Sequence, residues 1–169
     1  MLLLVGLGNP GSNYTNTRHN IGFKIIDAIN AHFKLSKQKP KFKGLLTTGN
    51  IDEKKIYAIK PLTFMNNSGT AIKELIDYFK IDEKDVFVFH DDMDIDFGKI
   101  KAKFGGSSAG HNGIESIDKF IGKDYARVRI GIGHPKQKKK VNNHVLEYFK
   151  EKKKKKINDI TGNIVKQLP

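Results

Sequence analysis

The stretch Val86-Phe87-Val88-Phe89-His90-Asp91-Asp92 decides the fold, because a continuous apolar run is followed at once by polar residues. Such a run predicts a strand covered on both faces, as in the middle of a parallel sheet. A second apolar run, Leu2 to Leu7, ends in glycine and proline and predicts another buried strand. We therefore expect central strands that carry polar side chains at their carboxyl ends.

Helices and further strands are expected around these two central strands. Helical spacing of apolar residues covers positions 21–33, 72–79 and 114–121, and further strands are predicted at 45–51, 55–59, 99–104 and 127–132. The first helix begins just after His19, and Ser68 or Thr70 is expected to cap the second. Strands interleaved with helices predict an α/β fold. We expect one domain over residues 1–169, a three-layer sandwich whose mixed, largely parallel central sheet has helices on both faces.

Charge and composition narrow the possible partners. The 31 lysine and arginine residues outnumber the 18 acidic residues and give a formal net charge of +13 over 169 residues. This excess favours binding to polyanions, although lysines on a solvated surface would give the same number. The absence of cysteine excludes disulfides and thiolate chemistry. With no stretch long enough to cross a bilayer, we expect a soluble cytoplasmic protein without membrane contact.

Two motifs match known ligand sites only in outline. Gly6-Leu7-Gly8-Asn9-Pro10-Gly11 has dinucleotide-binding spacing, but its last glycine opens a polar loop instead of a helix. Asp92-Met93-Asp94-Ile95-Asp96 resembles the start of a calcium loop, but its glycine is displaced to Gly98 and Lys103 stands where a glutamate is needed. We therefore expect neither a nucleotide cofactor nor a metal ion.

Polar residues follow several predicted strands and should meet at one edge of the sheet. Asn9 follows the first strand, Asn66 follows the strand at 55–59, and Asp91 closes the central run. His19 stands at the start of the first helix, where the helix dipole disfavours the imidazolium and keeps the ring able to accept a proton. A carboxylate such as Asp91 would fix the ring's tautomer. Asparagines in such loops serve turns or recognise a peptide group, and the sequence leaves both readings open.

Six segments, in the same order along the chain, closely resemble bacterial peptidyl-tRNA hydrolases. They are Gly6-Leu7-Gly8-Asn9-Pro10-Gly11, Thr17-Arg18-His19-Asn20-Ile21-Gly22-Phe23, Thr63-Phe64-Met65-Asn66-Asn67-Ser68-Gly69, His90-Asp91-Asp92, Gly110-His111-Asn112-Gly113 and Arg127-Val128-Arg129-Ile130-Gly131-Ile132-Gly133. The resemblance implies a monomeric esterase that needs no metal or cofactor and cleaves the peptide from peptidyl-tRNA. Water is the expected nucleophile, since no serine has a nucleophile-elbow setting.

The resemblance also implies roles for individual residues. His19 matches the catalytic base, Asp91 the residue that supports it, and Asn9 a position that distinguishes N-blocked from free aminoacyl-tRNA. The matching substrate-binding positions are Tyr14, Phe64, Asn66 and Asn112, and His111 is grouped with them as a binding candidate. Lys99, Lys101, Lys103 and Arg129 are candidates for tRNA phosphates by position. The segment Gly105 to Gly110 is expected to be a flexible lid, and the run Lys152 to Lys156 a solvated helix face.

Two rival functions belong to other classes. One is a non-catalytic RNA-binding protein on the same fold, which would keep the basic surface without hydrolysis; the joint presence of His19, Asp91 and Asn9 argues against it. The other is a general hydrolase of small esters, which would depend little on the tRNA part of the substrate.

Overall fold

The two apolar runs form neighbouring central strands in the computed structural model, which describes residues 1–134. Strand β1 (Leu2–Gly6) pairs in parallel with β5 (Val86–Asp92), and both are largely buried. Strand β4 (Lys54–Pro61) lies parallel to β1 on its other side, and β7 (Ala126–Gly131) lies parallel to β5. The interior of the sheet is therefore parallel, as continuous apolar runs predict.

Antiparallel strands extend the sheet at both edges. Strand β3 (Gly44–Ile51), predicted at 45–51, forms a hairpin with β4, and β6 (Ile100–Phe104) pairs with β7. A short strand that the sequence did not predict, β2 (Lys39–Lys41), pairs with β3, so the order is β2-β3-β4-β1-β5-β7-β6. The mixed, largely parallel sheet is thus confirmed. Strand β2 consists of two lysines around a proline, and all three residues are exposed, so the sequence offers no apolar periodicity there.

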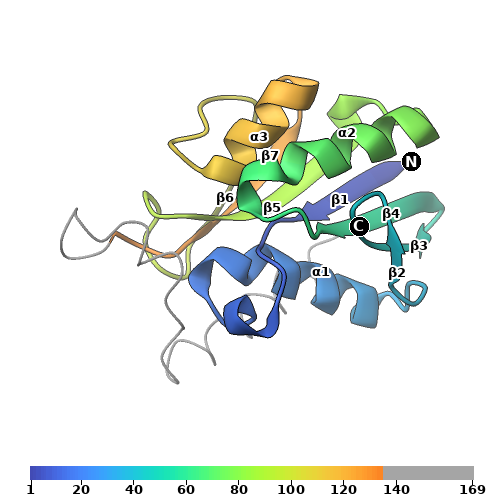
Figure 1. The fold of residues 1–169 in the computed structure, drawn as a ribbon, viewed down its shortest axis with the longest axis horizontal. Helices are drawn as coiled ribbons and strands as arrows, with labels where there is room; N and C mark the ends of the chain where they lie inside the picture. The colour runs from blue at the N-terminus through green and yellow to red at the C-terminus, as the bar shows by residue number, and fades with distance from the viewer. Residues whose placement is uncertain (135–169) are drawn as a thin grey trace.

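Helices cover both faces of this sheet (Figure 1). Helix α1 (Ile21–His32) packs on one face, where its isoleucines meet Leu4, Phe89 and Ile130. Helices α2 (Ser68–Phe79) and α3 (Asn112–Ile121) pack together on the opposite face. The predicted three-layer arrangement is confirmed.

Short 3-10 turns lead into two of the helices. Segment η2 (Arg18–Asn20) precedes α1, and η3 (Met65–Asn67) precedes α2. The predicted cap of α2 by Ser68 or Thr70 is wrong, because the helix starts after Asn67 without a side-chain cap. The two hydroxyls instead donate backward to carbonyl oxygens, Ser68 to that of Met65 and Thr70 to that of Asn67.

Glycines let α1 lie directly on the sheet. A Cβ added at Gly22 would stand 2.4 Å from the backbone nitrogen of Leu7 and 2.5 Å from the carbonyl oxygen of Phe89. On the strand side, a Cβ at Gly6 would stand 2.2 Å from the carbonyl oxygen of Gly22. This close approach fixes the start of α1, and with it His19, beside the carboxyl ends of β1 and β5.

No helix within residues 1–134 is long and apolar enough to cross a membrane. The lysine run 152–156, expected to be a solvated helix face, lies outside the described residues.

Candidate active site

The candidate site is built where the carboxyl ends of β1 and β5 face the amino ends of α1 and α3. Strand order reverses direction around these central strands, and ligands in open α/β sheets collect at such a place. One cavity of about 70 Å³ lies here and is bordered by His19, Asp91 and His111 together with the lid residues 108–110. It has room for a few water molecules.

His19 and Asp91 are in direct contact. The Nδ1 atom of His19 lies 2.8 Å from each carboxylate oxygen of Asp91. A carboxylate only accepts hydrogen bonds, so Nδ1 carries the hydrogen and Nε2 keeps the lone pair in the neutral ring. Nε2 has no hydrogen-bond partner within the described part of the chain, and the side chain is 9% exposed. The ring therefore presents a basic nitrogen at the mouth of the site.

Asp91 is buried yet ionised. Its burial alone would raise the carboxyl pKa, but the charges and hydrogen bonds of His19 and His111 outweigh that effect and hold the pKa far below its usual range. Each imidazole directs an N–H at the carboxylate, and the second contact, from His111 Nε2 to Oδ1, measures 2.7 Å. Asp91 thus offers a fixed negative charge beside His19.

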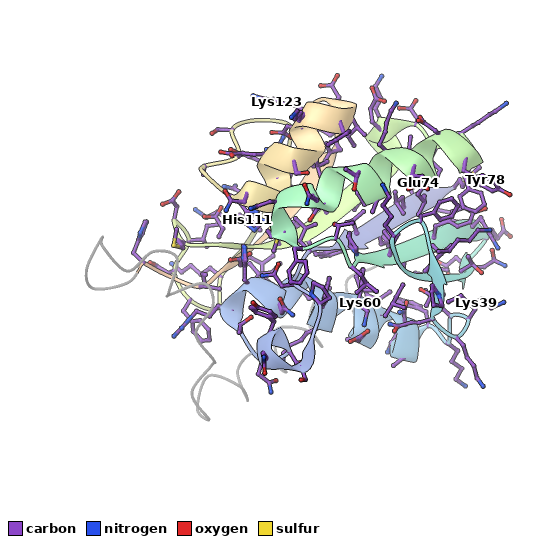
Figure 2. The ribbon with its side chains drawn as sticks, viewed as in Figure 1. Lys39, Lys60, Glu74, Tyr78, His111 and Lys123 are labelled. Carbon is purple, nitrogen blue, oxygen red and sulfur yellow. The ribbon has the colours of Figure 1, made fainter. Side chains whose placement is uncertain are left out.

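His111 joins this carboxylate to the start of α3. It is the N-cap residue, and its Nδ1 accepts hydrogen bonds from the backbone nitrogens of Gly113 (3.1 Å) and Ile114 (3.3 Å). Figure 2 shows the side chain at the amino end of the helix. Both ring nitrogens are therefore engaged inside the protein, although the sequence placed this residue among those that bind substrate.

His90 is a third imidazole at Asp91 that the sequence did not single out. Its Nδ1 donates to the backbone carbonyl oxygen of Asp91 at 2.7 Å, and its Nε2 is buried without a partner in the described region. Burial, reinforced by the nearby His111, lowers the pKa of His90 to about 3. His90 is thus neutral over the working range of most enzymes, and only the apolar run ahead of it hinted at its burial.

Asn9 is held by its neighbours on three sides. Its backbone nitrogen donates to Asn20 Oδ1 (2.7 Å), and its carbonyl oxygen accepts from Asn20 Nδ2 (2.9 Å). Its side-chain Oδ1 accepts from the backbone nitrogen of Met65 (2.8 Å). The amide therefore has a fixed orientation in which Nδ2 is the group left for a ligand. No role is predicted for Asn20 from the sequence. This residue follows His19 directly and joins Asn9 to the start of α1.

The other predicted binding residues lie around this centre in two groups. Tyr14 and Phe64 form an edge-to-face pair with ring centroids 6.4 Å apart, and Phe64 is 54% exposed. Asn66 and Asn112 border a shallow depression at the start of α3, together with Glu115, Ser116 and Lys119. The structure therefore gathers His19, Asp91, His111 and Asn112 around one cavity. Asn66 lies at the adjoining depression, and Asn9 lines a separate cavity next to Asn20.

Basic residues lie side by side on the last two strands. Lys101 is the register partner of Arg129, and Lys103 is the partner of Arg127. Because alternate residues share a face, these four side chains project from the same side of the sheet. Arg129 Nη1 lies 3.8 Å from Asp92 Oδ2, while Lys103 extends beside Gly106 of the lid. Lys99 precedes β6 and lies 3.6 Å from Asp96.

Arg127 is fully buried and anchors the lid. Its Nη2 contacts Asp118 Oδ1 at 2.9 Å, and its Nη1 donates to the carbonyl oxygen of Ser107 at 3.1 Å. The Tyr125 hydroxyl donates to the same Asp118 oxygen, and burial raises the pKa of that hydroxyl far above its usual value. The segment Gly105 to Gly110 is thus bonded, at the carbonyl oxygen of Ser107, to Arg127 of β7, which in turn contacts Asp118 of α3.

One group of side chains within residues 1–134 could hold a metal ion. The ligand atoms of His19, Asp91 and His111 all lie within 4.8 Å of one another. The hydrogen bonds among them account for this grouping, because both imidazoles direct an N–H at the same carboxylate oxygen.

Known proteins resemble this chain along its whole length. A family model described as peptidyl-tRNA hydrolase matches residues 3–169. The chain belongs to the peptidyl-tRNA hydrolase family. A peptidyl-tRNA hydrolase of Pelagibacter ubique is 70% identical over 99% of this chain and 90% of its own length, and one of Ehrlichia ruminantium is 48% identical over 98% and 85%. The crystal structure of the Acinetobacter baumannii peptidyl-tRNA hydrolase superposes with a TM-score of 0.93 at 35% identity, covering 98% of this chain and 85% of that one.

Membership in the peptidyl-tRNA hydrolase family confirms the resemblance that the six sequence segments carried. It also agrees with the α/β fold and its mixed sheet. At the switch in strand order, His19 contacts Asp91, and Asn9 is bonded to Asn20, the residue that follows His19.

Proposed function

We propose that this protein hydrolyses the ester bond between a peptide and tRNA, with His19 as the general base. The main support is the 2.8 Å contact between His19 Nδ1 and the Asp91 carboxylate, which fixes the ring hydrogen on Nδ1 and leaves Nε2 to accept a proton. Water gives that proton to Nε2 as its oxygen attacks the ester carbonyl. The bond to the ribose oxygen then breaks, the imidazolium returns the proton to that oxygen, and the peptide leaves as a carboxylate and the tRNA with a free ribose hydroxyl. Asp91 stabilises the imidazolium that forms.

The asparagines supply hydrogen bonds to the acyl part of the substrate. Asn9 directs Nδ2 outward because Oδ1 is bound to the backbone of Met65. This amide is a donor, suited to the carbonyl oxygen of the ester or of the first peptide group. A free aminoacyl-tRNA has an ammonium in place of the blocked amide, and it lacks the preceding carbonyl group. An Asn9 donor that binds the first peptide carbonyl has no such partner in free aminoacyl-tRNA, which favours peptidyl-tRNA.

Substitution of the base tests the proposal directly. Release of an N-acetylated aminoacyl group from tRNA should fall at least about 100-fold in His19→Ala. Binding of tRNA should remain, since phosphates supply most of the affinity. His32→Ala is the matched control, because His32 is exposed near the end of α1 and should leave turnover unchanged. Full activity of His19→Ala would exclude His19 as the base.

Asp91→Asn tests the supporting carboxylate. The amide has nearly the same shape but no negative charge, so turnover should slow markedly while tRNA binding changes little. A pH–rate profile identical to that of the wild type would count against the assigned role.

The rival functions predict different results in the same assays. A non-catalytic RNA-binding protein would bind tRNA while the wild type releases no acyl group. A general esterase would cleave an acyl-nucleoside ester as fast as the full substrate. The paired basic residues on β6 and β7 support a dependence on the tRNA portion.

We further propose that the active protein is a single-domain monomer that works in the cytoplasm. The match of one family model to residues 3–169 supports a single domain. Light scattering of the purified protein would give the mass of one 19.1 kDa chain if it is a monomer.

A further inference from the structure

His111 occupies an unusual position between two hydrogen-bonding systems. On one side its Nδ1 caps α3 by accepting from Gly113 and Ile114, and on the other its Nε2 lies 2.7 Å from Asp91 Oδ1. Backbone nitrogens can only donate, so Nδ1 must hold a lone pair. Nε2 then carries the hydrogen of the neutral ring and donates it to Asp91. The start of α3 thereby selects the tautomer of His111.

The same carboxylate oxygen serves both histidines. His19 Nδ1 lies 2.8 Å from Asp91 Oδ1, which also receives the His111 hydrogen. The two rings are 4.8 Å apart between centroids, and both side chains are nearly buried. A second donor withdraws electron density from Oδ1, so Asp91 stabilises the protonated form of His19 less than an undivided carboxylate would.

Other charged groups near His19 are accounted for by their own contacts. Neutral His90 is bound to the Asp91 backbone, Asp92 lies 3.8 Å from Arg129, Asp94 lies 2.6 Å from His134, and Arg18 is the neighbour on η2. Among the described residues, only His111 shares the Asp91 carboxylate with His19 through a hydrogen bond.

We propose that His111 is a positioning residue that limits the basicity of His19, by dividing the Asp91 carboxylate between the two imidazoles with a tautomer fixed at the start of α3. This inference rests on His19 acting as the base. Its consequence is that the enzyme keeps His19 unprotonated at lower pH than a simple His–Asp pair would allow, which extends activity toward acid.

Two variants separate the carboxylate contact from the helix cap. Asparagine is a good N-cap residue, so His111→Asn keeps the cap of α3. Its short side chain is engaged at the helix and makes no hydrogen bond to Asp91, so the carboxylate interacts with His19 alone. The acid limb of the pH–rate profile should move up by roughly 0.5 to 1 pH unit, as expected for loss of one hydrogen bond to a charged group. His111→Ala should show the same shift together with a lower melting temperature. The exposed His32→Asn is the control and should change neither quantity.

A measurement without substrate tests the same inference independently of hydrolysis. Nitrogen-15 NMR of the histidine rings should show His111 protonated on Nε2 and His19 on Nδ1 in the wild type. In His111→Asn, the His19 ring should titrate at higher pH than in the wild type. An unchanged or lower midpoint for His19 would overturn the inference even if hydrolysis is normal. Absence of hydrolysis in the wild type would refute the proposed function, while the NMR midpoint would still decide the coupling.

Discussion

Asn9 is restrained at its backbone nitrogen, its carbonyl oxygen and its side-chain oxygen, so the identity of the remaining group can be tested alone. Asn9→Asp keeps an oxygen for the Met65 backbone and replaces the outward NH2 by a second oxygen. Loss of that donor should reduce kcat/KM for an N-blocked aminoacyl-tRNA about 100-fold or more. Melting temperature should change little, because the contacts with Asn20 use the backbone of residue 9. Undiminished turnover would show that the Asn9 donor does not face the reacting acyl group.

His90 makes a separate prediction about acid stability. Burial lowers its pKa to about 3 in the folded protein, whereas the unfolded chain binds the proton near pH 6.5. Between these values the unfolded state holds more protons, so stability increases with pH and is lost as the solution is acidified from about 6.5 toward 3. This residue can contribute at most about 1.4 kcal/mol per pH unit over that window.

Urea unfolding at pH 7 and pH 5 measures this effect. The free energy of unfolding should fall more between the two values in the wild type than in His90→Gln, which has no titrating ring. His32→Gln at an exposed position is the control and should follow the wild type. Equal losses in all three proteins would mean that other groups cause the acid sensitivity.

At the scale of elements, the contact between α1 and the sheet positions the base. An added methyl group at Gly22 would strike the backbone of Leu7 and Phe89, neither of which can move without shifting a central strand. Gly22→Ala should therefore destabilise the fold by about 1–3 kcal/mol and displace η2 from Asp91, with a loss of turnover. Glu74→Ala, exposed on α2, should change stability by less than about 0.5 kcal/mol. Denaturant unfolding and the acyl-release assay measure both effects, and a fully stable, active Gly22→Ala protein would contradict this account of the packing.

Elements also show what a sequence can and cannot predict. The apolar runs at 2–7 and 86–89 predicted buried parallel strands, which bring their carboxyl ends to one edge, so Asn9 and Asp91 were expected at the same edge of the sheet. The direct contact of His19 with Asp91 did not follow from periodicity. The tautomer of His111 could not be predicted from the sequence, because it depends on backbone nitrogens at the first turn of α3. The reciprocal contact of Asn20 with Asn9 could not be predicted either, since a local sequence pattern does not reveal which buried amides face each other.

At the scale of the whole molecule, the net charge of +13 matters through where the charges lie relative to the site. The register pairs Lys101–Arg129 and Lys103–Arg127 belong to β6 and β7, beside the lid. Lys39 lies on β2, at the end of the molecule opposite His111 (Figure 2). A tRNA whose acceptor end enters the His19 cavity can reach Lys101, Lys103 and Arg129, while Arg127 is buried against Asp118 and Lys39 is far from that end.

Salt dependence of tRNA binding distinguishes these surfaces. Each lysine or arginine that neutralises a phosphate releases counterions, so Lys103→Ala and Arg129→Gln should each weaken binding and reduce the slope of log K against log salt by about 0.7–0.9. Lys39→Ala removes the same charge from the molecule but no contact, so its slope should equal that of the wild type. If all three substitutions weaken binding equally, then the overall charge rather than the β6–β7 surface holds the tRNA. Fluorescence anisotropy with labelled tRNA over a range of salt concentrations measures each slope. The tRNA carries no aminoacyl or peptidyl group, so the result does not depend on catalysis.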